Sequence, residues 1–220
     1  MSLIKFYRAN YSSAGITDAV LAELEAAAGH PLATRIDVSL RSDTRAASFL
    51  AINPNGHVPA LVLPSSGEPL WESAAITLHL GEVHGVAAGL YPDTAEERAQ
   101  AAKWIVWANV NLPMHARTVA RVVPGMSKKD KEEEEEEEGV RRVREMDAET
   151  ARGELGRLLG VLDKGLEGRE YLLERGYTLA DTHVWAFMAY IKMLGVDIER
   201  WGNVKRWMES VGGREQLKGL

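Results

Sequence analysis

The sequence contains no cysteine among its 220 residues. This absence excludes disulfide bonds, thiolate metal sites, iron–sulfur clusters and a cysteine nucleophile supplied by the protein itself. If thiol chemistry occurs here, the thiol must belong to another molecule. The chain is long enough to bury one large core or two small ones, and its 45% hydrophobic and 26% charged residues are typical of globular proteins in water.

Basic residues and long apolar runs are also scarce. The 26 Lys and Arg are outnumbered by 32 Asp and Glu, so the net charge of -6 leaves no basic surface for a phosphate backbone, and we expect no nucleic-acid partner. No apolar run approaches the ~20 residues that cross a bilayer, and residues 1–11 lack the apolar core of a secretory signal. We therefore expect a cytoplasmic protein with no membrane partner.

The first 85 residues mix strand and helix patterns. Residues 3–7 and 33–40 alternate as strands do, and turn-forming residues separate two more predicted strands at 58–63 and 68–71. Between them the spacing predicts helices around Ile16, Val20 and Leu24, over residues 44–51, and from Ser73 onward. The predicted order is β-α-β, α, β-β-α, which we assign to one domain over residues 1–85.

Strand signals almost vanish after the loop-like linker at residues 86–94, and we assign residues 95–220 to an all-helical domain. Residues 95–123 are expected to form a long helix, with a kink at Pro113 because proline removes a backbone donor. Residues 184–191 are apolar on every side, which predicts a helix at the centre of this domain. The charged block at 128–138, which ends in the run Glu132 to Glu138, is expected to be a solvated loop or helix surface.

One motif that carries chemistry is Gly56-His57-Val58-Pro59, in which a proline opens a predicted strand. If the Val58–Pro59 bond is cis, the backbone N–H and C=O of Val58 face outward and can pair with an extended peptide. The alternative is a trans proline that merely starts the strand. A second motif, Glu72-Ser73, stands at a strand-to-helix junction.

Ser73 is expected to be the N-cap of the helix that follows, so that the first helical amides bind a carboxylate while Glu72 holds an ammonium group. The pair is therefore suited to the zwitterionic end of an amino acid. The alternative is that Glu72 and Ser73 only cap the helix.

Together these motifs resemble the glutathione site of the cytosolic glutathione transferase family. The resemblance covers nearly the whole chain and rests on four stretches: residues 49–61, 72–76, the capping box Tyr177-Thr178-Leu179-Ala180-Asp181, and residues 203–207. It implies an α/β thioredoxin-like N-terminal domain followed by an all-α C-terminal domain. It also implies glutathione as co-substrate and a homodimer.

The resemblance also implies residue roles. Val58 would pair with the cysteinyl backbone of glutathione next to cis Pro59, and Glu72 and Ser73 would bind the γ-glutamyl end. His57 would contact the tripeptide. From its loop position, Arg41 is a candidate for the glycyl carboxylate, with a solvated surface arginine as the alternative.

Activation of the thiol needs a donor aimed at sulfur, because a free thiol has a pKa of about 8.5. The loop after the first strand must supply that donor, and it runs directly into the first helix. By position, Ser12 matches the activating residue of serine-type family members, and Ser13 is expected to cap the helix. In order of preference the candidates are Ser12, Ser13, Tyr7 and Tyr11; the alternative is that none of them activates a thiol.

An electrophile pocket is expected between this loop and the kinked helix. Asn111 and His115 are four residues apart and share a face, Trp107 adds aromatic surface, and Tyr11 comes from the loop. Aromatic residues at this spacing are also common in helix cores. His79 and His84 have the wrong spacing for metal ligands on one helix, so we expect no metal.

The function expected from the resemblance is a detoxification-type transferase that joins the glutathione thiolate to an apolar electrophile. The alternative is a non-catalytic interaction module, because residues 99–109 followed by Pro113 are also similar to the N-terminal domain of elongation factor 1 gamma subunits.

Overall fold

The computed structural model describes residues 3–124, 126 and 138–219. Most of the charged block predicted to be solvated lies outside these ranges, so that expectation stays a prediction. Glu138, its last residue, begins a long helix. Within the described residues, no helix is both long and apolar enough to cross a membrane.

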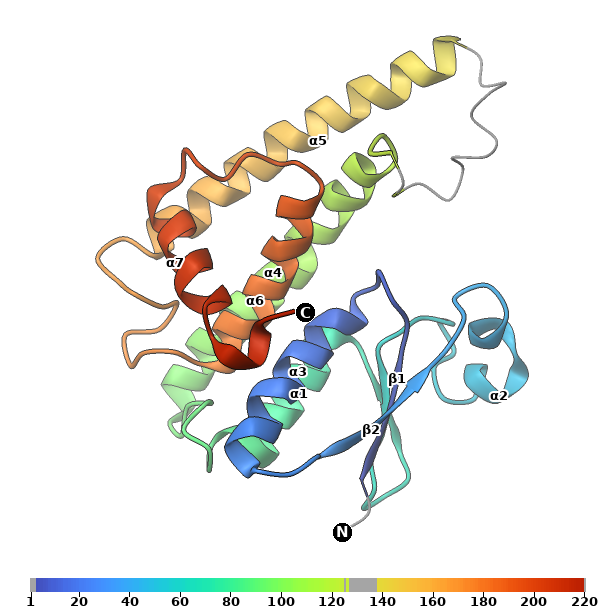
Figure 1. Cartoon of the computed structure of the whole chain (residues 1–220), viewed down its shortest axis with the longest axis vertical. Helices are drawn as coiled ribbons and strands as arrows, with labels where there is room; N and C mark the ends of the chain where they lie inside the picture. The colour runs from blue at the N-terminus through green and yellow to red at the C-terminus, as the bar shows by residue number, and fades with distance from the viewer. Residues whose placement is uncertain (1–2, 125, 127–137, 220) are drawn as a thin grey trace.

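The N-terminal part is built on one mixed sheet (Figure 1). The strands are β1 (Ile4–Arg8), β2 (Ala33–Asp37), β3 (Ala60–Val62) and β4 (Pro69–Trp71), in the order β2-β1-β3-β4. The β1–β2 pair is parallel, as expected of a crossover through a helix, and the other two pairs are antiparallel. All four predicted strands are confirmed, although the structure shortens those at 33–40, 58–63 and 68–71.

Helices cover both faces of the sheet (Figure 1). α1 (Ala14–Ala28) and α3 (Ser73–Leu80) lie on the face turned toward the helical part, and the short α2 (Ala47–Leu50) lies on the other. The helix predicted over 44–51 is divided, because Ala46 is extended and separates a 3-10 turn (Asp43–Arg45) from α2. α1 ends at Gly29, whose φ of 71° is in the left-handed region that glycine adopts freely.

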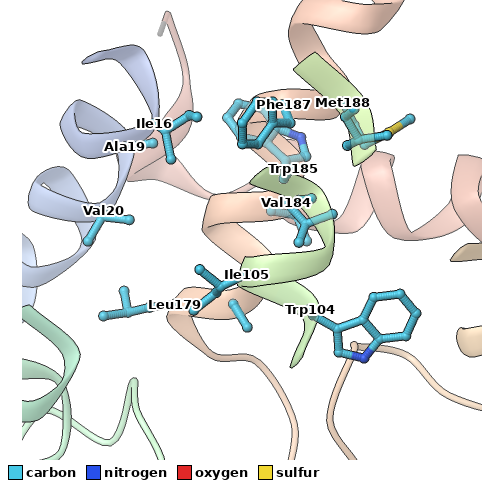
Figure 2. Packing of buried hydrophobic residues seen from close by; sticks show 14 of the residues in the cluster. Ile16, Ala19, Val20, Trp104, Ile105, Leu179, Val184, Trp185, Phe187 and Met188 are labelled. Atoms are coloured by element: carbon cyan, nitrogen blue, oxygen red, sulfur yellow. The ribbon is translucent and has the colours of Figure 1, made fainter. Parts of the chain in front are cut away.

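The C-terminal part contains α4 (Ala95–Ala120), α5 (Glu138–Gly165), α6 (Leu179–Met193) and α7 (Gly202–Gly212). α4 and α5 lie side by side, and α4 is assigned as one continuous helix through Pro113. α6 is the central helix, as predicted, and Figure 2 shows its apolar side chains packed between α1 and α4. Val184, Met188 and Ile191 are fully buried.

The start of α6 is held by the predicted capping box. Thr178 accepts from the helix amides while Asp181 accepts from the Thr178 amide at 2.9 Å. The same buried carboxylate accepts from the Leu172 amide at 2.8 Å and from the Trp207 indole at 3.0 Å. Asp181 therefore starts α6 and also ties it to α7.

A buried carboxylate joins the two parts of the chain. Glu23 of α1 is 2% exposed and accepts two hydrogen bonds from Arg214, at 2.6 and 2.8 Å. The Tyr177 hydroxyl donates to the same carboxylate at 2.9 Å, and the Arg214 guanidinium lies 3.7 Å from the centre of the Tyr177 ring. Because a buried charge is costly unless it is paired, this cluster fixes the C-terminal segment against α1.

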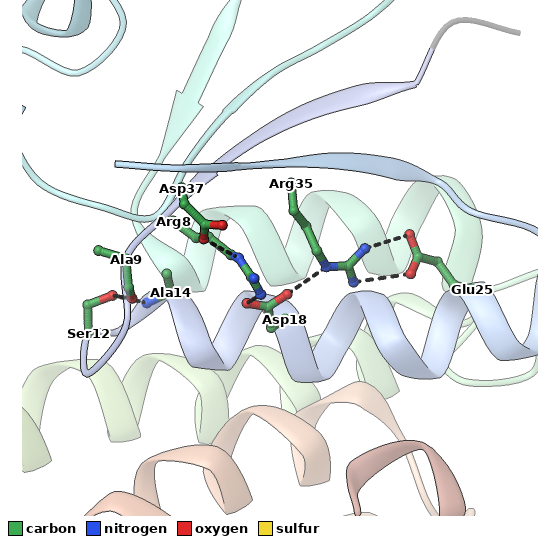
Figure 3. Close-up of polar contacts among 8 residues, drawn as sticks. All are labelled: Arg8, Ala9, Ser12, Ala14, Asp18, Glu25, Arg35 and Asp37. Atoms are coloured by element: carbon green, nitrogen blue, oxygen red, sulfur yellow. Dashed lines mark hydrogen bonds and ion pairs between the residues drawn. The ribbon is translucent and has the colours of Figure 1, made fainter. Parts of the chain in front are cut away.

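A row of alternating charges ties α1 to the sheet (Figure 3). Arg8 of β1 and Arg35 of β2 both bond to Asp18 of α1, at 2.9 and 2.8 Å, and Arg35 also reaches Glu25 with two bonds. Burial by itself raises the pKa of Glu25, but the bonds from Arg35 and from the amides of Leu32 and Ala33 outweigh it and leave that pKa below its ordinary value of 4.5.

The lowered pKa of Glu25 predicts acid-dependent stability. The unfolded chain binds a proton at Glu25 before the folded chain does, so the stabilisation is complete above about pH 4.5 and is lost as the pH falls through the folded pKa. We expect Glu25→Gln to lower the free energy of unfolding by about 1–2 kcal/mol at neutral pH, and the difference from wild type to shrink below pH 4.5. Urea unfolding at several pH values measures both effects.

The matched control is Glu154→Gln, which removes an exposed carboxylate that also accepts from an arginine, Arg157, at 2.8 Å. No measurable change is expected there, because exposed pairs contribute little. Parallel pH profiles for wild type and the Glu25 variant would contradict the assignment.

Candidate functional site

The Val58–Pro59 bond is cis, as predicted. It lies just before β3, and the Val58 amide has no hydrogen-bond partner within the described part of the chain. The Val58 carbonyl is not unpaired, in contrast to the sequence-based expectation, because it accepts from the Ser13 hydroxyl at 3.0 Å. The backbone edge therefore faces a serine at the start of α1.

The two serines at the start of α1 have different partners. Ser12 donates its hydroxyl hydrogen to the Ala9 carbonyl at 2.6 Å and accepts from the Ala14 amide at 3.2 Å (Figure 3). Ser13 occupies the N-cap position but its side chain makes no capping bond, which corrects the expectation that its hydroxyl caps the helix. The reason is that the Ser12 hydroxyl reaches the first helical amide instead. Ser13 is exposed and points to Val58.

The two tyrosine candidates lie elsewhere. Tyr7 of β1 packs edge-on against Phe49 of α2, with ring centres 5.8 Å apart. Alternation along the strand puts it on the opposite face from the fully buried Phe6. Tyr11 is 85% exposed and has a φ of 53°. Neither ring is part of the Ser13–Val58 contact.

Glu72 and Ser73 form the junction between β4 and α3. Glu72 has φ 72° and ψ 117°, a conformation that costs a non-glycine residue about 1–3 kcal/mol. Glu72, not Ser73, takes the N-cap position, so the prediction for Ser73 is wrong: it is the first residue of α3. Its buried hydroxyl accepts from the Asn109 side-chain amide of α4 at 2.9 Å. Glu72 is exposed, with its carboxylate available to a ligand.

The loop before Val58 is braced from within. Buried Asn53 donates its side-chain amide to the His57 carbonyl at 2.7 Å and accepts from the Asn55 amide at 3.0 Å. His57 itself is exposed. This Asx-type turn fixes the backbone that leads into the cis bond.

Of the arginines near this loop, the structure brings Arg45 closest. Arg41 is exposed, and its backbone amide bonds to the Ser39 hydroxyl at 3.3 Å. Arg45 lies over Gly56, where an added Cβ would meet its Nη1 at 2.6 Å. Sequence reasoning missed Arg45. The signal in the sequence was the glycine at position 56, because glycine is favoured where the backbone has a positive φ, here 63°, or where another group approaches closely.

The predicted electrophile residues of α4, Trp107, Asn111 and His115, are half-buried. Trp107 packs edge-on against Trp104, and Trp104 packs where a Cβ on Gly165 of α5 would meet its ring at 2.5 Å. Asn111 donates its amide to the Trp107 carbonyl at 2.8 Å. The pKa of Glu154 on α5 is lowered by Arg157 and, to a smaller extent, by His115. The grouping of Trp107, Asn111 and His115 with Tyr11 into an electrophile pocket stays a prediction.

A cavity of about 460 Å³ lies between the end of α4 and the start of α5, and none of those electrophile candidates lines it. Within residues 3–124, 126 and 138–219, no group of three or more His, Asp or Glu side chains is arranged to hold a metal ion.

Two domain families cover most of the chain. Residues 29–83 match the glutathione S-transferase N-terminal domain, and residues 113–215 match the glutathione S-transferase C-terminal domain. The chain therefore belongs to the glutathione S-transferase family, and the resemblance found in the sequence is confirmed.

The relatives found by sequence carry two kinds of name. The disulfide-bond oxidoreductase YghU of Escherichia coli is 26% identical over 185 residues, which is 80% of this chain but only 58% of YghU. The disulfide-bond oxidoreductase YfcG of E. coli is 28% identical over 76% of this chain and 72% of its own length. The glutathione S-transferase GstB of E. coli is 47% identical over 66 residues, 30% of this chain and 31% of its own length.

Solved structures confirm the fold. A glutathione transferase family member from Pseudomonas fluorescens, with two glutathione bound, superposes with a TM-score of 0.77 at 24% identity, covering 98% of this chain and 90% of that one. Ure2p in complex with glutathione superposes with a TM-score of 0.80 at 20% identity, covering 98% of this chain and 96% of that one.

The strain at Glu72 can be measured directly. Because glycine adopts positive φ without a steric penalty, we expect Glu72→Gly to be more stable than Glu72→Ala by about 1 kcal/mol. Both variants lose the same carboxylate, so the difference in unfolding free energy reports the backbone alone. Equal stability, or a more stable alanine variant, would show that this position is not strained.

Proposed function

We propose that this protein binds glutathione along the Val58–Pro59 edge and joins its thiolate to an apolar electrophile. The observation that carries the proposal is the contact of the Ser13 hydroxyl with the Val58 carbonyl, 3.0 Å apart although 45 residues separate them in sequence. It brings a hydroxyl, a helix N-terminus and the unpaired backbone amide of the largely buried Val58 into one place.

The tripeptide would bind mostly through backbone and charge. The Val58 amide would donate to the cysteinyl carbonyl and the Val58 carbonyl would accept the cysteinyl N–H, as in strand addition. The γ-glutamyl ammonium would pair with Glu72, and its carboxylate would lie at Ser73 and the N-terminus of α3. Arg45 is the better placed cation for the glycyl carboxylate, with His57 beside it and Arg41 as the candidate from sequence alone.

Binding itself would free the hydroxyl that stabilises sulfur. When the cysteinyl N–H takes the Val58 carbonyl, the Ser13 hydrogen is released from that carbonyl and can turn to the sulfur. The Ser12 hydroxyl is bonded on both sides to the loop and to α1, which favours Ser13 over the order inferred from sequence. A charge-assisted hydrogen bond near a helix N-terminus favours the thiolate, whose parent thiol has a pKa of about 8.5.

The chemical step would then need no covalent bond to the protein. The thiol proton leaves to solvent, the thiolate sulfur attacks the electrophilic carbon, a C–S bond forms, and the leaving group departs with its electron pair. The protein would contribute proximity and stabilisation of the thiolate.

A second candidate function is glutathione-dependent disulfide reduction. It is supported by the names of YghU and YfcG, which match 80% and 76% of this chain. The thiolate would attack one sulfur of a disulfide and release a thiol. Because the chain has no cysteine, a second glutathione would have to attack the mixed disulfide, giving oxidised glutathione and a second thiol.

Substitution of the two serines tests the proposal. We expect Ser13→Ala to raise the apparent thiol pKa of bound glutathione and to lower kcat with chlorodinitrobenzene about tenfold or more, because one charge-assisted hydrogen bond is lost. Ser12→Ala is expected to affect stability more than the thiol pKa. Ultraviolet titration of the bound thiolate measures the pKa.

Three results would separate the candidates. Turnover of bis(hydroxyethyl) disulfide without conjugation would favour the reductase. A wild-type protein that does not bind glutathione would remove both enzymes and leave the interaction module. If the thiol pKa changes more in the Ser12 variant than in the Ser13 variant, Ser12 is the activating residue, as the sequence alone suggested.

A homodimer and a cytoplasmic location are also part of the proposal. Reduced glutathione is a cytosolic thiol, which supports the location. An apolar row of α4, Val106, Val110 and Met114, is 46–69% exposed at a spacing of four residues, which supports association of two copies.

The dimer is testable at the centre of that row. Val110→Lys is expected to shift the protein from dimer to monomer in sedimentation velocity, because it buries an unpaired charge in the interface. Gln100→Lys, at an exposed position of the same helix, should leave the dimer intact. A wild type that sediments as a monomer would contradict the proposal.

A further inference from the structure

A chain of side-chain hydrogen bonds runs from the predicted γ-glutamyl site into the core. Asn109 of α4 donates its amide nitrogen to the Ser73 hydroxyl oxygen at 2.9 Å. The oxygen of the same amide lies 2.6 Å from Nε2 of His183 on α6, and Nδ1 of His183 lies 2.8 Å from the Thr77 hydroxyl on α3. Ser73 and Thr77 are one helical turn apart on α3. The series of hydrogen bonds therefore leads from α3 through α4 and α6 and back to α3.

The orientation of the Asn109 amide, with its nitrogen toward Ser73 and its oxygen toward His183, sets the direction of every hydrogen bond in this row. The amide oxygen of Asn109 can only accept, so Nε2 of His183 must carry the hydrogen. Complete burial lowers the pKa of His183 to about 3, so the ring is neutral at physiological pH and has a single N–H. Nδ1 therefore accepts from the Thr77 hydroxyl.

The consequence lies at the other end of the chain. Since the Ser73 oxygen accepts from Asn109, the Ser73 hydrogen is left to donate to a different acceptor. That polarity suits an anionic acceptor and not an ammonium group. Neighbouring Glu72 is exposed and carries the opposite preference, so the two adjacent residues discriminate between the two charges of an amino-acid end.

We propose that Asn109 and His183 are positioning residues that hold the Ser73 hydroxyl as a hydrogen-bond donor to the γ-glutamyl α-carboxylate of glutathione. This inference rests on the proposed function, because it assumes that glutathione binds at Ser73. It assigns to the helical part of the chain a share in recognition of the tripeptide, through residues that do not touch it.

Asn109→Asp tests the direction of these hydrogen bonds with little change in the shape of the side chain. Aspartate still accepts from His183, but it cannot donate to Ser73, so the Ser73 hydrogen turns inward to the new carboxylate. We expect the dissociation constant for glutathione, measured by calorimetry on the full chain, to rise about 10- to 100-fold, the scale of a lost hydrogen bond to a charged group.

A ligand without the carboxylate distinguishes positioning from general damage. γ-Aminobutyryl-cysteinyl-glycine lacks only the γ-glutamyl α-carboxylate, and its affinity is expected to differ less than threefold, on the order of RT, between wild type and the Asn109 variant. Gln100→Glu makes the same amide-to-carboxylate change at an exposed position of α4 and should leave both affinities unchanged.

His183 is tested by a pair of variants. His183→Gln keeps an N–H donor where Nε2 stands and should retain most of the glutathione affinity. His183→Leu leaves the Asn109 oxygen without a donor, and we expect it to lose several-fold in affinity for glutathione but not for the analogue. Because the glutathione-to-analogue ratio is taken within one protein sample, partial unfolding of a variant does not move it.

The outcomes separate the two proposals. If wild type fails to bind glutathione, the proposed function falls and this inference falls with it. If wild type binds glutathione but Asn109→Asp binds it equally well, or loses glutathione and the analogue to the same extent, only the positioning role is overturned. The positioning role is supported if Asn109→Asp and His183→Leu lose affinity for glutathione but not for the analogue, while His183→Gln retains most of its affinity for glutathione.

Discussion

The hydrogen bond from the Ser13 hydroxyl to the Val58 carbonyl joins two segments that are 45 residues apart in sequence. One is the N-terminus of α1, where helix amides and their positive potential lie. The other is the turn that precedes β3, where the Val58–Pro59 bond is cis and the Val58 amide has no partner within the described residues. Because these two segments meet, a peptide edge and a hydroxyl donor share one location, and the proposed stabilisation of a glutathione thiolate depends on that meeting.

Ion pairs within the N-terminal part and contacts from the helical part hold that arrangement in place. Asp18 is bonded by Arg8 and Arg35 and fixes α1 against the sheet, while Glu23 on the same helix is paired with Arg214 near the C-terminus. Asn109 reaches from α4 to Ser73 at the start of α3. The two parts therefore meet through buried and directional polar contacts as well as apolar packing, and such contacts are stabilising only in one relative position.

Local sequence patterns predicted most of the helices and strands and one buried polar motif, the capping box of α6. Alternation located all four strands, and the capping box at Thr178 and Asp181 formed as expected. The wrong predictions concern the N-caps of α1 and α3, where the local backbone conformation, and not the residue type alone, decides which residue caps the helix. Ser73 was expected to cap α3, but the left-handed backbone of Glu72 takes that position, and the Ser12 hydroxyl, not that of Ser13, reaches the first amide of α1.

By itself the sequence determined the periodicities, the absence of a protein thiol and the two motifs around Val58 and Ser73, because these depend on residue types and on spacings along the chain. Only the tertiary structure decided that Ser13 faces Val58, that Arg45 lies over Gly56, and that Ser73, Asn109 and His183 are hydrogen-bonded in a row. The physical reason is that each of these contacts joins segments far apart in sequence or depends on a side-chain direction, and both are set by packing.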